Sequence, residues 1–322
     1  MNTPVTASAP GKIILFGEHA VVYGRPALAA PVSQVSARVT VTPDPTADSD
    51  GGLRIQSPAI NLYAQWNSLP PENPARAAIQ SILSELNQPQ PPTCTVRITS
   101  SIPVSAGLGS GAAVSIAILR AFSAYLGTPL PNERINALAY EIEKLHHGTP
   151  SGIDNTVITY NQPVFFIKGQ PIETFQVPVA FTLLIADTGI PAPTAQTVSG
   201  VRQMWQAKPQ EYERHFSAIG KIARQARKAI ESGTPEKLGA LMDENHFYLQ
   251  KIGVSCPQLD NLVRAARKAG AFGAKLSGGG GGGNLIALIR PEDAAEIASA
   301  LEQAGATRVI VTEIGNKQGE MM

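Results

Sequence analysis

Two stretches in the first third of the chain alternate polar and apolar residues. They are residues 32–42, VSQVSARVTVT, and residues 94–102, CTVRITSSI, and many of their side chains are β-branched. A period of two with β-branched residues predicts half-buried strands. The intervening residues 43–74 are rich in Pro, Asp, Asn and Gly. This composition predicts irregular surface structure between the strands.

Helical spacing of apolar residues follows in the same half of the chain. It predicts helices over residues 75–86, 110–126 and 132–148. The third helix ends at Gly148, a residue typical of the position just after a helix. Together with the strands, these helices predict an α+β domain with glycine-rich loops.

The pattern changes after residues 163–175, PVFFIKGQPIETF. Strand-like residues 181–189, FTLLIADTG, introduce a second mixture of elements. The predicted helices there span 194–206, 210–232, 235–250, 257–269 and 291–304, and the predicted strands span 272–277, 284–290 and 307–313. The pattern in this half of the chain predicts a sheet covered by helices. We place the boundary near residue 175, which gives domains 1–175 and 176–322.

Composition favours a two-domain enzyme with a small-molecule partner. The 322 residues suffice for two domains of ordinary size, each with its own core. Lys and Arg number 26 against 25 Asp and Glu, so no long-range field would attract nucleic acid or an acidic membrane surface.

Cysteine usage and hydropathy indicate the cellular compartment in which the protein is expected. Cys94 and Cys256 are far apart and form no Cys-x-x-Cys pattern, which predicts ordinary thiols in a reducing compartment. The N-terminal MNTPVTASAPGK has no basic stretch before an apolar core, and Arg120 interrupts the longest apolar run, residues 112–126. We therefore expect a soluble, cytoplasmic protein.

Residues 9–29, APGKIILFGEHAVVYGRPALA, form the most specific stretch of the chain, here called segment 9–29. Lys12, Glu18 and His19 are polar residues in apolar company, and glycines close by permit a close approach of backbones. Taken singly, Lys12 is typical of a surface and His19 of a core. Together they predict a pocket.

A second stretch, residues 103–117 (PVSAGLGSGAAVSIA), packs three glycines into five positions before a helix. Such a turn directs backbone N–H groups and the positive end of the helix dipole at one spot, which suits a phosphate. A tight strand-to-helix turn packed against a sheet is the alternative.

Two further stretches are candidates for chemistry. Residues 143–155, EKLHHGTPSGIDN, end a helix and enter a Pro/Gly turn carrying Asp154, which suits either a catalytic carboxylate or a helix cap. Residues 275–289, KLSGGGGGGNLIALI, place six glycines between strand-like segments. Because apolar strands bound it on both sides, this run predicts a close backbone approach to a ligand or to another loop rather than a linker.

Segment 9–29 and the stretches 143–155 and 275–289, in this order and spacing, resemble the three motifs of the GHMP kinases. Segment 9–29 is similar to the mevalonate kinase family in particular, as are HGTPSGIDN and residues 188–202, TGIPAPTAQTVSGVR. The resemblance spans nearly the whole chain. It implies a two-domain α+β fold, with a ribosomal-protein-S5-like N-terminal domain, a ferredoxin-like C-terminal domain and an active site in the cleft between them.

The resemblance also implies roles in phosphoryl transfer from ATP to the 5-hydroxyl of (R)-mevalonate. Asp154 would accept the proton of that hydroxyl or orient it, with Lys12 beside it. Glu143 and Ser110 would bind Mg²⁺. Lys12, Glu18, His19, Asp154 and Thr194 fall on positions that contact mevalonate. The positions that would wrap the nucleotide are Pro103, Ser105, Ala106, Gly107, Leu108, Gly109, Ser110, Gly111 and Ala112. A homodimer is compatible with the sequence.

One position departs from the family pattern. The family reads Gly-Leu-Gly-Ser-Ser-Ala, and its second serine helps to hold Mg²⁺, but this chain has Gly111 there. Either Ser110 supplies the oxygen, or Glu143, phosphates and water complete the shell. The alternatives to a mevalonate kinase are another GHMP small-molecule kinase and a ligand sensor that has lost catalysis, for which Gly111 would carry no penalty.

Overall fold

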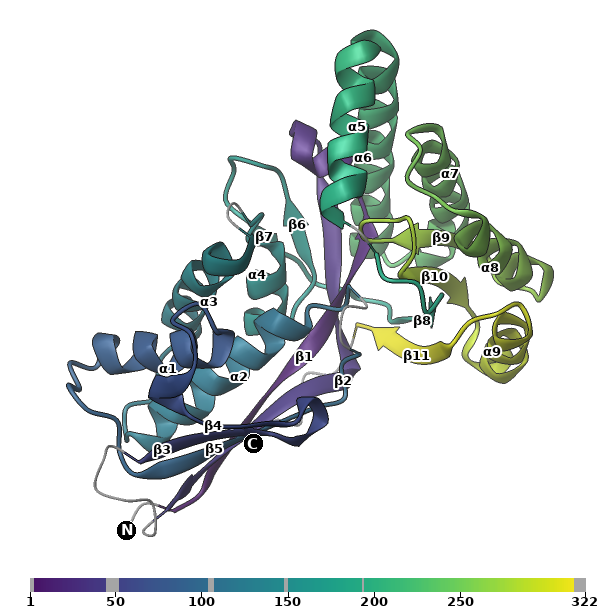
Figure 1. Ribbon diagram of the computed structural model, residues 1–322. Coiled ribbons are helices and arrows are strands. Elements are labelled where there is room, and N and C mark those ends of the chain that lie inside the picture. The colour runs from purple at the N-terminus through teal and green to yellow at the C-terminus, as the bar shows by residue number, and fades with distance from the viewer. Residues whose placement is uncertain (1–2, 45–51, 104–106, 148–149, 193, 316–322) are drawn as a thin grey trace. The chain divides into compact units, whose positions relative to one another are not determined.

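The computed structural model describes residues 3–44, 52–103, 107–147, 150–192 and 194–315 (Figure 1). Backbone contacts group the chain into two compact units. The first comprises Met1–Gly11, Val35–Pro103 and Gly109–Asn161, and the second comprises Lys12–Gln34, Val104–Leu108 and Gln162–Met322. The units are discontinuous because strands β1 (Val5–Phe16) and β2 (Ala27–Pro43) contribute residues to both. The continuous division 1–175 and 176–322 stays a prediction about domains rather than a description of these units.

The sheet of the first unit has the order β4 (Leu62–Gln65), β3 (Leu53–Ser57), β5 (Cys94–Ser100), β2, and β1 also pairs with β2. Strands β2 and β5 are antiparallel, with Ala37 opposite Ser100, whereas β3 and β5 are parallel. Burial alternates along β2 and β5, as the sequence pattern predicts. Both predicted strands are confirmed, and β2 begins earlier than expected.

The prediction of irregular structure over residues 43–74 is wrong for its described part. Strands β3 and β4 form an antiparallel pair there, with 3₁₀ turns η2 (Pro58–Ile60) and η3 (Trp66–Ser68). Leu53 and Ile55 are fully buried while Arg54 and Gln56 are partly exposed. An alternation of five residues between turn-forming residues is too short to outweigh the surrounding composition.

Within its described residues, the first unit also contains helices α1 (Pro74–Glu85), α2 (Ser110–Tyr125), α3 (Asn132–His147) and α4 (Ile153–Tyr160). The first three are confirmed predictions, and α4 replaces the expected turn. The predicted stop of the third helix, Gly148, lies outside the described residues. Helix α2 contacts α1, α3, α4 and β5, and Figure 1 shows the helices on one face of the sheet. The many alanines of α2 permit this close packing of the helices.

The second unit contains an antiparallel sheet of β8 (Phe181–Asp187), β9 (Gly273–Ser277), β10 (Asn284–Ile289) and β11 (Arg308–Ile314). Its order is β11-β8-β10-β9. Helices follow β8, and α9 (Ala294–Gln303) connects β10 to β11. Numbered within this domain, the strand order is 4-1-3-2 with β-α-β-β-α-β connections, which is the ferredoxin-like arrangement that the resemblance implied.

Helices α7 (Leu238–Lys251), α8 (Pro257–Lys268) and α9 contact this sheet. Leu276, Leu285 and Ala287 are fully buried in the core that they share. Two short 3₁₀ turns, η4 (Pro235–Lys237) and η5 (Pro291–Asp293), lead into α7 and α9. The predicted helices and strands of this half are confirmed to within a few residues.

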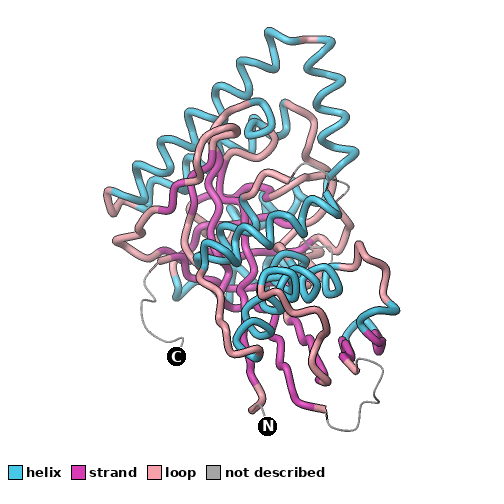
Figure 2. The backbone as a smooth tube through the Cα atoms, turned by 90° about the vertical axis from the view of Figure 1, so that its left-hand side faces the viewer, coloured by secondary structure: helices cyan, strands magenta, loops and turns pink. Residues whose placement is uncertain are grey.

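Helices α5 (Thr194–Ala207) and α6 (Pro209–Glu231) form a hairpin that turns at Lys208; they are the long helices that meet at the upper end of Figure 2. The 3₁₀ turn η1 (Ala20–Tyr23) packs on α6. The rings of Tyr23 and Phe216 stack with centroids 4.1 Å apart. Strands β6 (Val164–Phe166) and β7 (Glu173–Thr174) extend from the first residues of β2.

No helix in the described ranges is both long and apolar enough to cross a membrane. Cys94 and Cys256 are both free thiols. Burial raises the pKa of the Cys94 thiol to about 12, which makes it a poor nucleophile.

Candidate active site

The N-terminus of α2 has the geometry expected of an anion site. Its N-cap is Gly109 in the left-handed conformation (φ 73°, ψ 29°), and no side chain caps the helix. The N–H groups of the first turn are therefore available to a ligand, and the helix dipole favours a negative charge beside them. Of the predicted nucleotide residues, Ser105 and Ala106 lie outside the described part of the chain.

Gly111 lies in the first turn of this helix. A Cβ added there would meet no heavy atom within 4 Å outside its chain neighbours and its own helix backbone. Its backbone is helical, a conformation open to any residue. Neither clash nor backbone strain therefore requires glycine at the position where the family has its second serine.

Asp154 is the second residue of α4 and is half-buried. The N-cap of α4 is Gly152, with φ 83° and no side-chain cap bond. The alternative interpretation of Asp154 as an N-cap is therefore wrong. A carboxylate in the first helical turn is favourably placed by the helix dipole.

Asn136 on α3 fixes the position of α4. Its side-chain oxygen accepts hydrogen bonds from the Asn155 amide at 2.7 Å and from the Thr156 hydroxyl at 3.4 Å. Glu143 follows Asn136 by seven residues, two turns further along the same side of α3. Asp154 and Glu143 thus lie on two helices that are joined directly by Asn136.

Arg120 on α2 ties the other end of α4. One guanidinium nitrogen donates to the Ser8 carbonyl oxygen at 3.0 Å and the other to the carbonyl oxygen of Thr159. Sequence reasoning missed both Arg120 and Asn136 as supports of the site, because their partners lie far away in sequence or on an unpredicted helix.

Lys12 lies on β1 and is only 8% exposed. Its backbone N–H donates to the Leu108 carbonyl oxygen at 3.0 Å, so β1 touches the predicted nucleotide loop. Lys12 belongs to the second unit and Asp154 to the first. Their predicted partnership stays a prediction.

His19 adopts a rare backbone conformation, with φ 60° and ψ −49°. The Ala20 N–H donates to the Glu18 carbonyl oxygen at 2.6 Å, which closes a three-residue γ-turn around His19. This form of the γ-turn is strained in L-residues. Strain of this kind persists where the surrounding structure imposes it, and it concentrates at functional sites.

The ring of His19 is buried and has a defined tautomer. Its Nε2 lies 2.9 Å from the Gly279 carbonyl oxygen, and a carbonyl can only accept, so Nε2 carries the proton and Nδ1 is an acceptor. Burial lowers the pKa of His19 to about 4, against a smaller opposing effect of this hydrogen bond. At neutral pH the ring is uncharged and can accept a hydrogen bond from a hydroxyl.

Glu18 is held entirely within the protein. Its side chain is 1% exposed, and one carboxylate oxygen pairs with the ammonium of Lys275. The other oxygen accepts from the Asn245 amide at 3.2 Å. The predicted contact between Glu18 and substrate stays a prediction. Sequence reasoning missed Lys275, although a single lysine in the apolar strand GAKLS is a usable signal.

The glycine run 278–283 packs closely against other loops. A Cβ on Gly280 would lie 2.0 Å from the Val254 carbonyl oxygen, and one on Gly282 would lie 2.6 Å from that of Ile190. Of the two explanations for this run, close approach to other loops is confirmed.

Gly279 also brings two predicted substrate residues together. A Cβ on Gly279 would lie 2.5 Å from the Thr194 hydroxyl oxygen, and the Gly279 carbonyl binds the His19 ring. Thr194 is exposed at the start of α5. The structure therefore places a hydroxyl and a neutral imidazole around one glycine.

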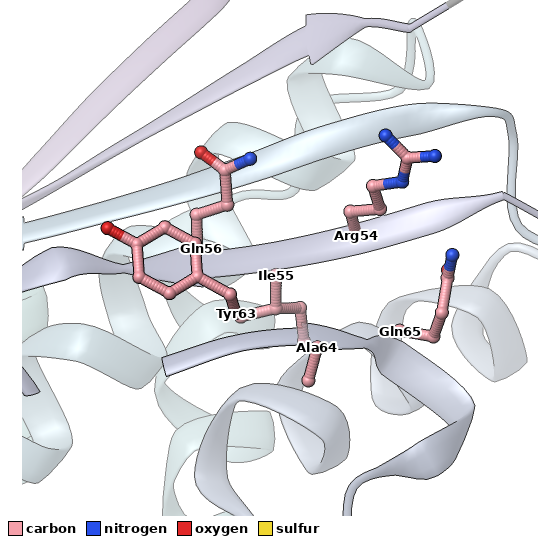
Figure 3. A pocket seen from close by; sticks show the side chains of 6 residues that line it. All are labelled: Arg54, Ile55, Gln56, Tyr63, Ala64 and Gln65. Carbon is pink, nitrogen blue, oxygen red and sulfur yellow. The ribbon is translucent and has the colours of Figure 1, made fainter. Parts of the chain in front are cut away.

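A surface hollow lies elsewhere, on the β3–β4 pair (Figure 3). Its lining residues are Arg54, Ile55, Gln56, Tyr63, Ala64 and Gln65. None of them belongs to the predicted motifs, and Arg54 pairs with Asp44 at 3.5 Å.

Comparison with known families defines the class. The model of the GHMP kinases N terminal domain matches residues 73–162, and that of the GHMP kinases C terminal domain matches residues 226–307. These matches cover the first-unit helices and much of the ferredoxin-like domain. The chain is an ATP-dependent kinase of the GHMP class.

Similarity to individual proteins identifies the family within this class. The mevalonate kinase of Thermococcus gammatolerans is 38% identical over 98% of this chain and 97% of its own length. The structure of L. major mevalonate kinase in complex with R-mevalonate matches with a TM-score of 0.82 and 30% identity, over 98% of this chain and 99% of that one. The Methanococcus jannaschii mevalonate kinase structure matches with a TM-score of 0.84 and 28% identity, over 98% and 99%. The chain belongs to the mevalonate kinase family.

Proposed function

We infer that this protein transfers the γ-phosphoryl group of ATP to the 5-hydroxyl of (R)-mevalonate. The observation that carries the substrate assignment is the meeting of His19 and Thr194 at Gly279. A neutral imidazole whose Nδ1 is an acceptor suits an alcohol. The full-length similarity to mevalonate kinases, one of them solved with R-mevalonate, supports the same substrate.

The nucleotide phosphates would bind at the uncapped N-terminus of α2. Gly109 keeps that end free of a capping side chain, so the backbone N–H groups of Ser110, Gly111 and Ala112 can donate to phosphate oxygens. Their donation would orient ATP without any covalent participation of the protein.

The residues present fit a magnesium ion shared with the nucleotide. No three His, Cys, Asp or Glu side chains gather into a metal cage within the described residues, and Glu143 with Ser110 offers one carboxylate and one hydroxyl. Magnesium is commonly held by one or two carboxylates, with phosphates and water filling the shell. When bound, Mg²⁺ would neutralise charge on the phosphate oxygens.

Asp154 would act as the base. It would accept the proton of the 5-hydroxyl or hold that hydroxyl in line with the phosphorus, while Lys12 stabilises charge on the transferring group. The half-buried position of Asp154 in the first turn of α4 supports this role. The cytoplasmic location and a homodimer stay predictions.

Release of ADP tests the proposal. In a coupled assay with ATP and magnesium, (R)-mevalonate should stimulate ADP formation, whereas galactose and phosphomevalonate should not. Stimulation by either of those compounds instead would favour another GHMP kinase. Binding of mevalonate without any turnover would favour a ligand sensor.

A further inference from the structure

Lys275 is a fully buried lysine that the reaction described above does not use. It lies at the centre of β9, whose residues are all buried. Its ammonium pairs with Glu18, donates to the Leu276 carbonyl oxygen at 2.6 Å and lies 5.9 Å from the centre of the Phe16 ring. Burying such a pair gains little stability over apolar residues of the same size. A role in fixing one arrangement of the chain explains its presence better.

Glu18 connects Lys275 to the strained turn. The Glu18 carboxylate is held on one side by Lys275 from β9 and on the other by Asn245 from α7. The backbone carbonyl oxygen of the same residue accepts the N–H of Ala20 that closes the γ-turn. Anchoring the side chain of Glu18 therefore restrains the turn at His19.

The end of β9 and the start of the glycine run reach segment 9–29 at every second residue. Lys275 binds Glu18, the Ser277 hydroxyl donates to the Ile14 carbonyl oxygen at 2.7 Å, and Gly279 accepts from the His19 ring. Alternate residues of a strand point to the same side. One side of β9 thus contacts segment 9–29 through Lys275 and Ser277, and the backbone carbonyl of Gly279 adds a third contact beyond the end of the strand. Of these three contacts, only that of Lys275 is charged.

We propose that Lys275 is a positioning residue for the alcohol substrate, acting through Glu18 to hold His19 in the strained turn from which its ring meets the substrate. This inference rests on the proposed function, because that function places His19 at mevalonate. In this proposal Glu18 acts by holding the turn at His19, and it is the His19 ring that contacts the substrate.

Two variants separate positioning from simple stability. Lys275→Met leaves Glu18 buried without its cation, so the melting temperature should fall. The kcat/KM for mevalonate should also fall, by about tenfold to a hundredfold, since a misplaced substrate contact has effects of that size. The KM for ATP should stay within a few-fold. The double variant Glu18→Gln with Lys275→Met removes both charges.

The double variant should regain most of the melting temperature and keep the low kcat/KM for mevalonate. Recovery of both quantities together would overturn the proposal, since the pair would then serve stability alone. Asp243→Ala is the matched control, because Asp243 on α7 accepts from the Ala274 N–H of β9 at 3.0 Å without touching segment 9–29. It should lower the melting temperature and leave kcat/KM unchanged.

A crystal structure of Lys275→Met gives a readout independent of activity. Loss of the Glu18–Ala20 turn, with His19 displaced from Gly279, supports the positioning role. An intact turn overturns it, even if the wild-type protein proves inactive on mevalonate. Inactivity of the wild type would refute the proposed function alone.

Discussion

At the scale of single residues, the proposed reaction assigns the role of base to Asp154. Asp154→Asn keeps the shape of the side chain and removes its charge and basicity. We expect kcat to fall by about 10² to 10⁴, with the KM for ATP little changed, in steady-state assays.

Asp293→Asn is the control for Asp154→Asn, because Asp293 precedes α9 and pairs with Arg290 at 2.6 Å on the surface. It should leave kcat unchanged. A kcat for Asp154→Asn within a few-fold of wild type would make Asp154 a structural residue.

Gly111 offers a test of how magnesium is held. Because a Cβ there meets open space, Gly111→Ser should fold normally and add the hydroxyl that the family has at this position. We expect half-maximal rate at a lower free magnesium concentration. Glu143→Gln, which removes the charge of the proposed magnesium ligand, should require a much higher free magnesium concentration.

The opposite result for Gly111→Ser would mean that the added hydroxyl does not bind magnesium. If Gly111→Ser weakens ATP binding and leaves the magnesium dependence unchanged, the first turn of α2 is reserved for the phosphates. Ser110 or water would then supply the missing ligand.

His19 makes stability depend on pH. Its pKa is 6.5 in the unfolded chain and about 4 in the folded protein. Between these values the unfolded chain binds a proton that the folded protein does not, so stability rises with pH across this window and is complete above 6.5. Lowering the pH from 7 to 5 should cost about 2 kcal/mol through His19 alone.

Urea unfolding of wild type and His19→Gln at pH 7 and pH 5 measures this effect. Glutamine does not titrate, and its amide can still donate to Gly279. His246, whose pKa burial also lowers, contributes equally to both proteins. An equal loss of stability in wild type and variant would show that His19 is not buried as a neutral ring.

The sequence alone singles out residue types but not their partners. Lys12, His19 and Asp154 stand out because polar residues are rare in their apolar or glycine-rich surroundings. The partner of Glu18 is 257 residues away, and no local pattern connects the two. A buried ion pair across that separation becomes visible only when β9 is folded against segment 9–29.

At the scale of elements, the glycine run is shaped by its neighbours. Gly280→Ala would press a Cβ against the backbone of Val254, which cannot move aside as a side chain can. We expect a loss of about 2–4 kcal/mol in the free energy of unfolding, measured with urea.

Gly278→Ala is the matched control for Gly280→Ala. Gly278 also has positive φ, at 90°, but a Cβ there meets nothing within 4 Å. Backbone strain alone should cost about 1–2 kcal/mol. Equal losses for the two variants would mean that conformation, and not packing, requires glycine throughout the run.

Long elements are predictable and short ones are not. Helices α2 and α6 repeat their apolar spacing over many turns, so periodicity identifies them. Helix α4 has eight residues and follows Pro and Gly, and β3 and β4 together have nine. In such short segments tertiary packing decides the structure against local composition.

At the scale of the whole molecule, the elements and the order of the strands are predicted from different information. Periodicity predicts mixed helices and strands in both halves, but it contains nothing about strand order. The order β11-β8-β10-β9 follows from the family resemblance carried by the motifs. The discontinuity of the two units arises because β1 and β2 are long enough to serve both.

Under the proposed function, this chain phosphorylates the primary alcohol of mevalonate. Phosphorus NMR of the product formed from ATP and (R)-mevalonate tests it most directly. A 5-phosphate ester gives a phosphorus triplet, because the two protons of the C5 methylene couple to it. A singlet from an ester at the tertiary C3, or inorganic phosphate with unchanged mevalonate, would contradict the account.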